Sequence, residues 1–347
     1  MNHPHSAPRV RSILSAAILL ALSNTIYAEE ASDEPTIVVS AARSAQVVTD
    51  ALPHTTLIDR ATIEQSPAAD VVGLLKMQSG LSITQSGTSG SLSGVRIRGG
   101  EPRHTLILLD GVPMNALSSG IPSLEQIPLS NIEKIEIVRG NVSALYGSQA
   151  VGGVIQIFTR KAKANENDAT IRVAGGSHGQ LQASAQVRGG NEKIQATFGI
   201  AHDEVKAVSA QNAQDMSRIN SYATVNTDKD GYRNNSANGH VRYRPNDNHE
   251  IGLHFLDSRG KNHYDSSYAA SDKAIQYNQT HVQNISVYSN DQWTKNWKSS
   301  LRVSQYTDRS IDVDTPPSYG TGKSLFQTRT KEISWQNNIH TNFGEWI

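Results

Sequence analysis

The residues best suited to chemistry are oxygen ligands in the segment NTDKDG, residues 226–231. Asn226, Asp228 and Asp230 stand at alternate positions and Gly231 follows them, which is the first half of a calcium-binding EF-hand loop. Position twelve of such a loop would be Ala237, where an EF-hand has a bidentate glutamate. The spacing therefore argues against a complete EF-hand and leaves an ordinary polar loop or another kind of cation site.

Motifs for covalent catalysis are not found. The chain contains no cysteine, so thiol catalysis, disulfides and Cys-based zinc sites are excluded. No P-loop, HExxH or GxGxxG pattern occurs, and GSLSG at 90–94 has the wrong spacing for a nucleophile elbow. His104 and Asp110 could be combined with one of many serines, but any chain of this size offers such triples. We therefore expect no enzymatic activity.

The charge balance and the N-terminus indicate an exported protein. With 32 basic and 32 acidic residues, the chain lacks the basic excess of a nucleic-acid binder, and its mean hydropathy of −0.44 leaves no room for a helical membrane protein. Arg9 and Arg11 precede the short apolar run at 13–22, and Ala28 precedes two glutamates. This pattern predicts a secretory signal peptide over residues 1–28; an N-terminal anchor is the alternative.

Residues 46–162 have the texture of a small α+β domain. Ser66, as an N-cap before Pro67, predicts a helix that ends at Gly80. Its apolar stripe would be Val71, Val72, Leu74, Leu75 and Met77. Short strands are predicted at 94–98, 104–110, 132–139 and 152–159, with a tight turn at Asp110-Gly111 and a helical turn within 143–150.

From about residue 163 onward, alternation of apolar and polar residues is the main signal. About eight strands are predicted, with short turns at 189–191 and 245–248 and polar loops at 203–236, 259–278 and 308–327. The aromatic residues that would form interfacial girdles are Trp293, Trp297, Trp335, Trp346, Tyr243, Tyr288 and Tyr306. This pattern is typical of an outer-membrane β-barrel. A soluble secreted β-sandwich also alternates and is the alternative.

One further segment, EPTIVVSAAR at 34–43, has strong strand preference at Thr36, Ile37, Val38 and Val39. A lone strand cannot satisfy its own backbone groups, so it needs an edge to pair with. That edge belongs either to the α+β domain or to another protein.

Two longer stretches resemble a known family. GVRIRGGEPRHTLILLDGVPMN (94–115) and IEKIEIVRGNVSALYGSQAVGGVIQIFTR (132–160) are similar to the plug domain of TonB-dependent outer-membrane transporters. The likeness runs from residue 34 to the end and is nearest to the family's cobalamin transporters. One departure is Asn141, where the family usually has proline, and we expect it to affect only the turn. The resemblance implies four parts: a signal peptide at 1–28, a periplasmic segment at 29–45, a plug at 46–162 and the first part of a 22-stranded transmembrane barrel at 163–347.

The resemblance also implies partners. Thr36, Ile37, Val38, Val39, Ser40 and Ala41 would be the TonB box, which TonB, energised by ExbB and ExbD, would grip by strand addition. The protein would act as a monomer in the outer membrane of a Gram-negative cell. Its cargo would be cobalamin or another corrinoid. A ferric siderophore or haem receptor is the alternative, and a secreted β-sandwich adhesin is the alternative from another class.

Site residues follow by position from the same resemblance. Loops 84–94 and 115–120 would contact the ligand, and Glu101 replaces an uncharged residue of the family; the implied set is Leu92, Gly94, Glu101, Ser118, Ser119 and Tyr264. Calcium would be held by Asn226, Asp228, Asp230, Tyr264, Asp265 and Asp272, and would order two long loops. The segment at 202–207 does not match an expected upstream aspartate, so one of two calcium sites stays open. Arg98 and Arg139 would form ion pairs with barrel glutamates beyond Ile347, and a solvated loop position is the alternative for each.

Barrel closure sets a last expectation. About eight strands cannot close a barrel wide enough for a plug of this size, and an open edge in lipid leaves backbone groups unsatisfied. We therefore expect this chain to be the N-terminal part of a longer receptor.

Overall fold

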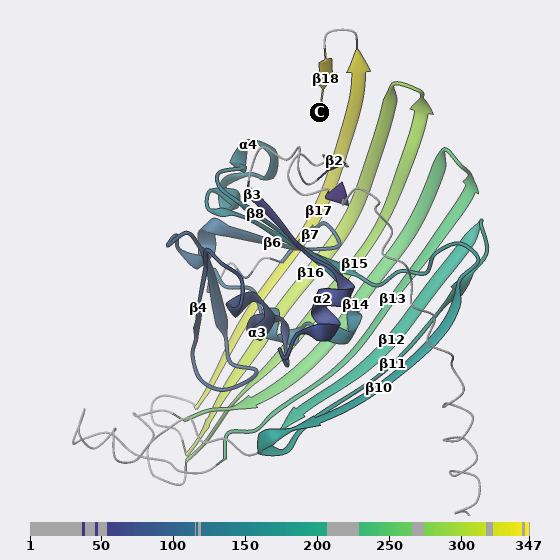
Figure 1. Cartoon of the computed structure of the whole chain (residues 1–347). Helices are drawn as coiled ribbons and strands as arrows, with labels where there is room; N and C mark the ends of the chain where they lie inside the picture. The colour runs from purple at the N-terminus through teal and green to yellow at the C-terminus, as the bar shows by residue number, and fades with distance from the viewer. Residues whose placement is uncertain are drawn as a thin grey trace, which may run out of the picture. The chain divides into compact units, whose positions relative to one another are not determined.

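The computed structural model describes residues 37–38, 46–47, 54–114, 116, 119–206, 229–265, 274–316, 322–341 and 344–346. They form an α+β domain, purple to blue in Figure 1, and one large antiparallel sheet, teal to yellow. Among these residues, no helix has the length and apolar character needed to cross a membrane.

The α+β domain begins with β3 (His54–Ile58) and two short helices, α2 (Arg60–Gln65) and α3 (Val71–Lys76). The predicted N-cap at Ser66 is wrong, because Ser66 ends α2. The N-cap of α3 is Asp70, whose carboxylate accepts a hydrogen bond of 2.6 Å from the backbone N–H of Gly73. A carboxylate at this position also interacts favourably with the positive end of the helix.

The domain's main sheet has the order β3-β8-β9-β6-β7, and only β6 and β9 are parallel neighbours. Its other strands are β6 (Thr105–Leu109), β7 (Val112–Pro113), β8 (Ile132–Arg139) and β9 (Gly153–Thr159). A separate hairpin joins β4 (Leu81–Gln85) to β5 (Ser93–Ile97). The remaining elements are η2 (Pro102–His104), η3 (Leu124–Gln126), η4 (Leu129–Asn131), α4 (Ser143–Tyr146) and η5 (Ser148–Ala150). The four predicted strands are β5, β6, β8 and β9, and the predicted turn at Asp110-Gly111 joins β6 to β7 with positive φ at both residues.

The core of this domain is made of branched apolar side chains from α3, the main sheet and the segment around η3. It continues onto the large sheet, because Leu256, Val282 and Tyr306 belong to the same buried cluster. The α+β domain and the large sheet therefore share one hydrophobic core.

The large sheet runs in chain order, each strand antiparallel to the next. Its strands are β10 (Asn167–Gly176), β11 (Gln180–Gly190), β12 (Ile194–Val205), β13 (Tyr232–Asn246), β14 (His249–His263), β15 (Ile275–Thr294), β16 (Trp297–Thr315), β17 (Lys323–Thr341) and β18 (Gly344–Trp346). The first eight have ten residues or more, as the alternation predicts, and β18 adds three. A 3-10 turn, η6 (Ser177–Gly179), joins β10 to β11.

The predicted polar loops are too long. β14 and β15 stay paired as far as His263 opposite Tyr277, and β16 pairs with β15 up to Thr315. In these outer portions the strands carry polar residues, as in QYNQTH at 276–281. Backbone pairing continues there without the apolar alternation by which the strands were predicted.

The N-terminal segment forms its own short ladder. β1 (Ile37–Val38) pairs with β2 (Gln46–Val47), with Ile37 opposite Val47. Within the described residues, neither strand joins the other sheets. The segment expected to lack an edge thus has a two-residue partner close by. Thr36, Val39, Ser40 and Ala41 lie outside the described residues.

Candidate functional site

The exposed face of the large sheet is apolar and its buried face is polar, the reverse of the usual arrangement in a soluble protein. All but three of the exposed large apolar side chains in the described chain lie on this sheet, among them Ile171, Phe198, Val287 and Ile333. The opposite face is buried and polar, with Gln195, Asn234, His240, His254, Asn284 and Ser286. A sandwich would bury its apolar face between two sheets. This sheet presents it outward, as a membrane wall does towards lipid.

The tryptophans cluster at the short-turn end of the sheet. Trp293 and Trp297 flank the turn between β15 and β16, with ring centroids 6.3 Å apart, and both are exposed. Tyr288 and Tyr306 do not belong to this girdle, contrary to the prediction. They face the buried side, where the Tyr288 hydroxyl lies 2.9 Å from His240 Nε2 and Tyr306 is fully buried in the shared core. Successive side chains of a strand point to opposite faces of the sheet. The position of each tyrosine in its strand therefore decides which face it lies on, whatever its residue type.

Against the polar face, η3 is the most densely bonded contact of the α+β domain. The hydroxyl of Ser123 donates to Asp308 Oδ2 (2.8 Å), and that of Tyr232 donates to the backbone oxygen of Glu125 (2.8 Å). Gln126 accepts through its side chain from Asn234 (2.8 Å) and through its backbone oxygen from Ser258 (2.6 Å). Three strands, β13, β14 and β16, thus hold this single turn.

The carboxyl of Glu125 is buried beside this contact. Burial raises its pKa well above the usual range, and Asp308 and Asp70 raise it further. Its Oε2 has no hydrogen-bond partner among the described residues. The buried site therefore favours the neutral form of the Glu125 carboxyl over the charged form.

A second contact forms at the β6–β7 turn. Asp110 lies within 3.0 Å of Lys161 Nζ and 3.1 Å of His254 Nε2, and accepts from the Thr159 hydroxyl (2.6 Å). Burial alone would raise the pKa of Asp110, but Lys161 and His254 outweigh it and the pKa falls below its usual range. Asp110 therefore stays ionised, and His254 ties this turn to β14.

The predicted ligand-contact residues are spread around the ends of the α+β domain. Leu92 and Ser119 are exposed, and Glu101 forms an exposed ion pair of 2.6 Å with Arg103. Gly94 is buried within β5 opposite Thr84. Tyr264 is half-buried just past β14, and Ser118 lies outside the described residues. No ligand is present, so these assignments stay predictions.

The predicted calcium ligands are only partly described. Asn226, Asp228 and Asp272 lie outside the described residues. The others come from two adjacent strand ends, since the N–H of His263 donates to the backbone oxygen of Gly231 (2.9 Å), placing Asp230 near Tyr264 and Asp265 in the chain fold. Within the described ranges, no group of three His, Cys, Asp or Glu side chains could hold a metal ion. Calcium needs six to eight oxygens, so the described residues alone do not fit such a site.

Arg98 and Arg139, the two arginines predicted to form ion pairs with barrel glutamates, have different surroundings. Arg98 is exposed with a positive φ of 51°, whereas Arg139 is buried. Arg139 donates to Thr56 Oγ1 (2.6 Å) and to the backbone oxygen of Ser79 (3.0 Å). Burial lowers the pKa of Arg139, and Arg98 lowers it further. In the described part neither forms an ion pair with a carboxylate, and Arg139 Nη2 is buried without a hydrogen-bond partner there.

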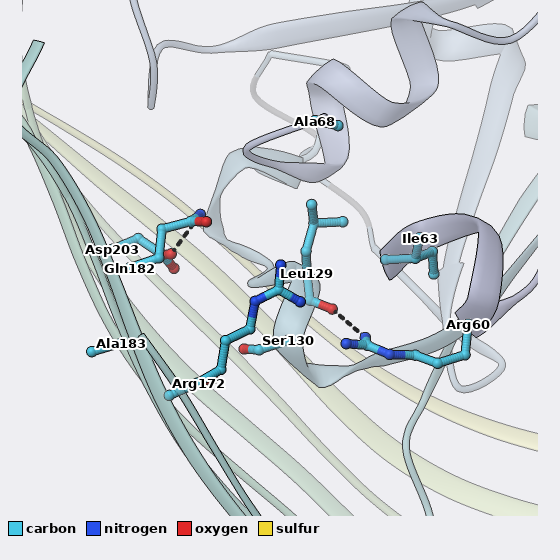
Figure 2. A pocket seen from close by; sticks show the side chains of 10 residues that line it. Arg60, Ile63, Ala68, Leu129, Ser130, Arg172, Gln182, Ala183 and Asp203 are labelled. Carbon is cyan, nitrogen blue, oxygen red and sulfur yellow. Dashed lines mark hydrogen bonds between the residues drawn. The ribbon is translucent and has the colours of Figure 1, made fainter. Parts of the chain in front are cut away.

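Two cavities differ in size along the interface. Figure 2 shows the smaller one, of ≈ 30 Å³, where Arg60 and Leu129 approach Gln182 and Asp203 of the sheet. Such a volume holds about one water molecule. The larger one, of ≈ 1030 Å³, lies between Leu106 and Leu108 on one side and charged residues such as Arg302 on the other. The α+β domain therefore packs closely against the large sheet at η3 and leaves a larger space nearer the short turns.

Tyr232, Ser123 and Asp308 were not expected from the sequence as interface residues. Each contact joins positions more than a hundred residues apart, and no local spacing signals it. The only available hint was polar residues at inward positions of otherwise apolar strands.

Comparison with known proteins shows which family and which relatives this chain resembles. Residues 48–154 match the family described as the TonB-dependent receptor plug domain. A curated relative, the vitamin B12 transporter BtuB of Vibrio vulnificus, is 30% identical over 333 residues, covering 94% of this chain and 51% of that protein. The chain thus spans about half the length of the curated relatives it matches.

Solved structures share the fold. The ferripyoverdine receptor of the outer membrane of Pseudomonas aeruginosa aligns with a TM-score of 0.69 at 10% identity, covering 90% of this chain and 43% of that one. The siderophore receptor PirA of Acinetobacter baumannii aligns with a TM-score of 0.64 at 20% identity, covering 82% and 45%.

Proposed function

The chain belongs to the TonB-dependent receptor family, and we propose that it supplies the plug and the first part of the wall of an outer-membrane receptor that takes up cobalamin or a related corrinoid. The relatives in this family are receptors and transporters, not enzymes. Uptake by such a receptor requires binding and release without covalent chemistry.

The observation that carries this proposal is the polarity of the large sheet together with its contacts to the plug. The sheet turns apolar side chains outward and holds the plug on its polar face through η3 and Asp110. Among the described residues, three side chains of the sheet, Leu256, Val282 and Tyr306, also join the buried apolar cluster of the plug. The plug can therefore shift by breaking polar contacts and exposing a limited apolar area. That property suits a pore that is closed until it is pulled open.

The choice of cobalamin rests on sequence similarity to proteins described as vitamin B12 transporters. The second candidate, a ferric siderophore, is favoured by fold neighbours described as ferric enterobactin and ferripyoverdine receptors, which share only 18% and 10% identity. The exposed plug residues Leu92 and Ser119 offer apolar and hydroxyl contacts, and the nearby charges Glu101 and Arg103 pair with each other. A bulky ligand of low net charge suits such a surface.

TonB would act on residues 36–41. Within the described residues the ladder between β1 and β2 has two residue pairs, and an isolated two-stranded ladder is at best marginally stable. TonB could replace β2 or pair with the other edge of β1, with backbone hydrogen bonds providing the affinity.

Equilibrium binding tests the cargo. The full chain, purified in detergent, is titrated with cyanocobalamin and separately with ferric enterobactin. Saturable binding of cyanocobalamin alone supports the proposal, binding of ferric enterobactin alone supports the second candidate, and binding of neither contradicts both.

A further inference from the structure

Tyr232 occupies a junction that no predicted site included. It is the first residue of β13 and only 8% exposed. Its ring and its hydroxyl contact two different plug segments. The ring meets the turn between β4 and β5, and the hydroxyl meets η3. The turn lies within the predicted ligand loop 84–94, and η3 follows the predicted ligand loop 115–120 in the chain.

The ring contact requires glycine at position 90. Gly90 has a φ of +81°, and a Cβ there would lie 1.9 Å from Tyr232 Cδ2. The ring therefore lies directly on the Gly90 backbone. Any side chain at this position would displace either the plug turn or the tyrosine.

The hydroxyl contact fixes η3. Tyr232 donates to the backbone oxygen of Glu125 over 2.8 Å. This bond adds to those that Asn234 and Ser258 donate and to the one that Asp308 accepts from Ser123. One rigid side chain thus spans the gap between the β4–β5 turn and η3. A shift of either segment must move the ring or break this hydrogen bond.

The neighbouring strand extends the junction. Asn262 of β14 lies opposite Tyr232. With its amide oriented to satisfy both ends, Asn262 accepts from the Ser91 hydroxyl (3.1 Å) and donates to the backbone oxygen of Ser89 (3.0 Å). Next along, His263 bonds to Gly231. The wall positions that hold the β4–β5 turn are therefore those from which chain segments 207–228 and 266–273 depart.

We propose that Tyr232 is a positioning residue that couples the β4–β5 turn, within the predicted ligand loop 84–94, to η3, and both to the outer ends of β13 and β14. The inference rests on the proposed function, because it describes how a ligand bound at loop 84–94 would affect the docking of η3. The coupling itself is a property of the ligand-free protein and is tested there.

Hydrogen exchange followed by mass spectrometry on the full, ligand-free chain tests the coupling. Tyr232→Phe keeps the ring and removes only the hydroxyl, and should speed exchange about fivefold in η3, as expected for one net hydrogen bond. The same variant should also speed exchange in residues 86–93, which the hydroxyl does not touch. Tyr288→Phe is the matched control, since it removes a buried hydroxyl bonded within the wall, and should change neither segment.

The reciprocal test starts from the glycine. Gly90→Ala should speed exchange in η3 as well as in its own turn. Its control, Gly99→Ala, has a similar φ of +78° with nothing within 4 Å of the added Cβ, and should leave η3 unchanged. Exchange altered only in the segment next to each substitution, or equally in the controls, would overturn the proposal.

A measurement of ligand binding distinguishes failure of this proposal from failure of the cargo proposal. Tyr232→Phe should weaken cyanocobalamin binding about fivefold, and Tyr288→Phe should not. If the unaltered chain binds no cyanocobalamin, the cargo proposal fails, while the exchange results still decide the coupling. If it binds and Tyr232→Phe has unaltered affinity, the coupling does not reach the ligand and the proposal fails.

Discussion

At the scale of single residues, the most consequential charge is Asp110, which connects the β6–β7 turn with Lys161 and with His254 of the wall. Asp110→Asn keeps the shape and the Thr159 contact but removes the carboxylate charge that pairs with Lys161. Loss of one partner of a buried pair costs about 3–5 kcal/mol, and less here because the Lys161 side chain is 33% exposed. We expect a loss of about 2–3 kcal/mol in urea unfolding. Asp168→Asn, which removes an exposed partner of Arg188, should cost under about 1 kcal/mol; equal losses would contradict this account.

Glu125 should make the free energy of unfolding decrease as the pH rises. Its pKa is raised in the folded protein, so the folded state binds a proton that the unfolded state releases above about pH 4.3. Its contribution is complete below that pH and is lost as the pH rises towards the folded pKa, by at most about 1.4 kcal/mol per pH unit. Glu125→Gln, neutral at every pH, should flatten this decline between pH 5 and 8 in urea unfolding. A slope equal to that of the unaltered chain would show that Glu125 is not the group responsible.

At the scale of elements, β1 is the segment on which energised transport would depend. Val38→Pro removes a backbone donor within the two-residue ladder and within the proposed TonB box. We expect binding of the purified TonB C-terminal domain to the full chain, measured by calorimetry, to fall at least tenfold. Val38→Ile, which keeps strand geometry, should bind as the unaltered chain does, and cyanocobalamin affinity should be the same in all three. Intact TonB binding by Val38→Pro would exclude strand addition at this position.

The calcium site stays a prediction made from the family resemblance, and EDTA tests it. If Asn226, Asp228, Asp230, Tyr264, Asp265 and Asp272 hold calcium as proposed, removing it frees clustered carboxylates to repel one another. Cyanocobalamin should then bind more weakly in EDTA, with recovery on adding calcium and not magnesium. Unchanged affinity in EDTA would remove calcium from the account.

Particular elements show what could be read from the sequence. β8 was predicted at its observed bounds because Ile132, Ile135, Ile137 and Val138 favour a strand and Gly140 follows it directly. The helix cap was misplaced because Ser66 and Asp70 are both good N-caps, and only the tertiary position of α2 decides between them. Strand ends were predicted too early because backbone pairing continues through polar residues. The contacts of Tyr232 and Asp110 could not be predicted, since they depend on how the plug is rotated against the wall.

At the scale of the whole molecule, the family relationship and the physics of the sheet agree. Apolar residues face outward along β10 to β17, and the polar inner face bonds to the plug. The chain spans about half the length of its curated relatives, so uptake by the whole receptor stays a proposal. What the described residues specify is the plug, its docking to the wall and the polarity of that wall.

The most direct measurement of this central claim uses the absence of native cysteine. Single cysteines are introduced at two adjacent positions of β15, Val287→Cys on the outward face and Ser286→Cys on the buried face. Each is labelled with an environment-sensitive fluorophore before reconstitution in vesicles of phospholipids with brominated acyl chains. Strong quenching at 287 and little at 286 is the result that a lipid-facing wall requires. Equal quenching at both positions, or stronger quenching at 286, would contradict it.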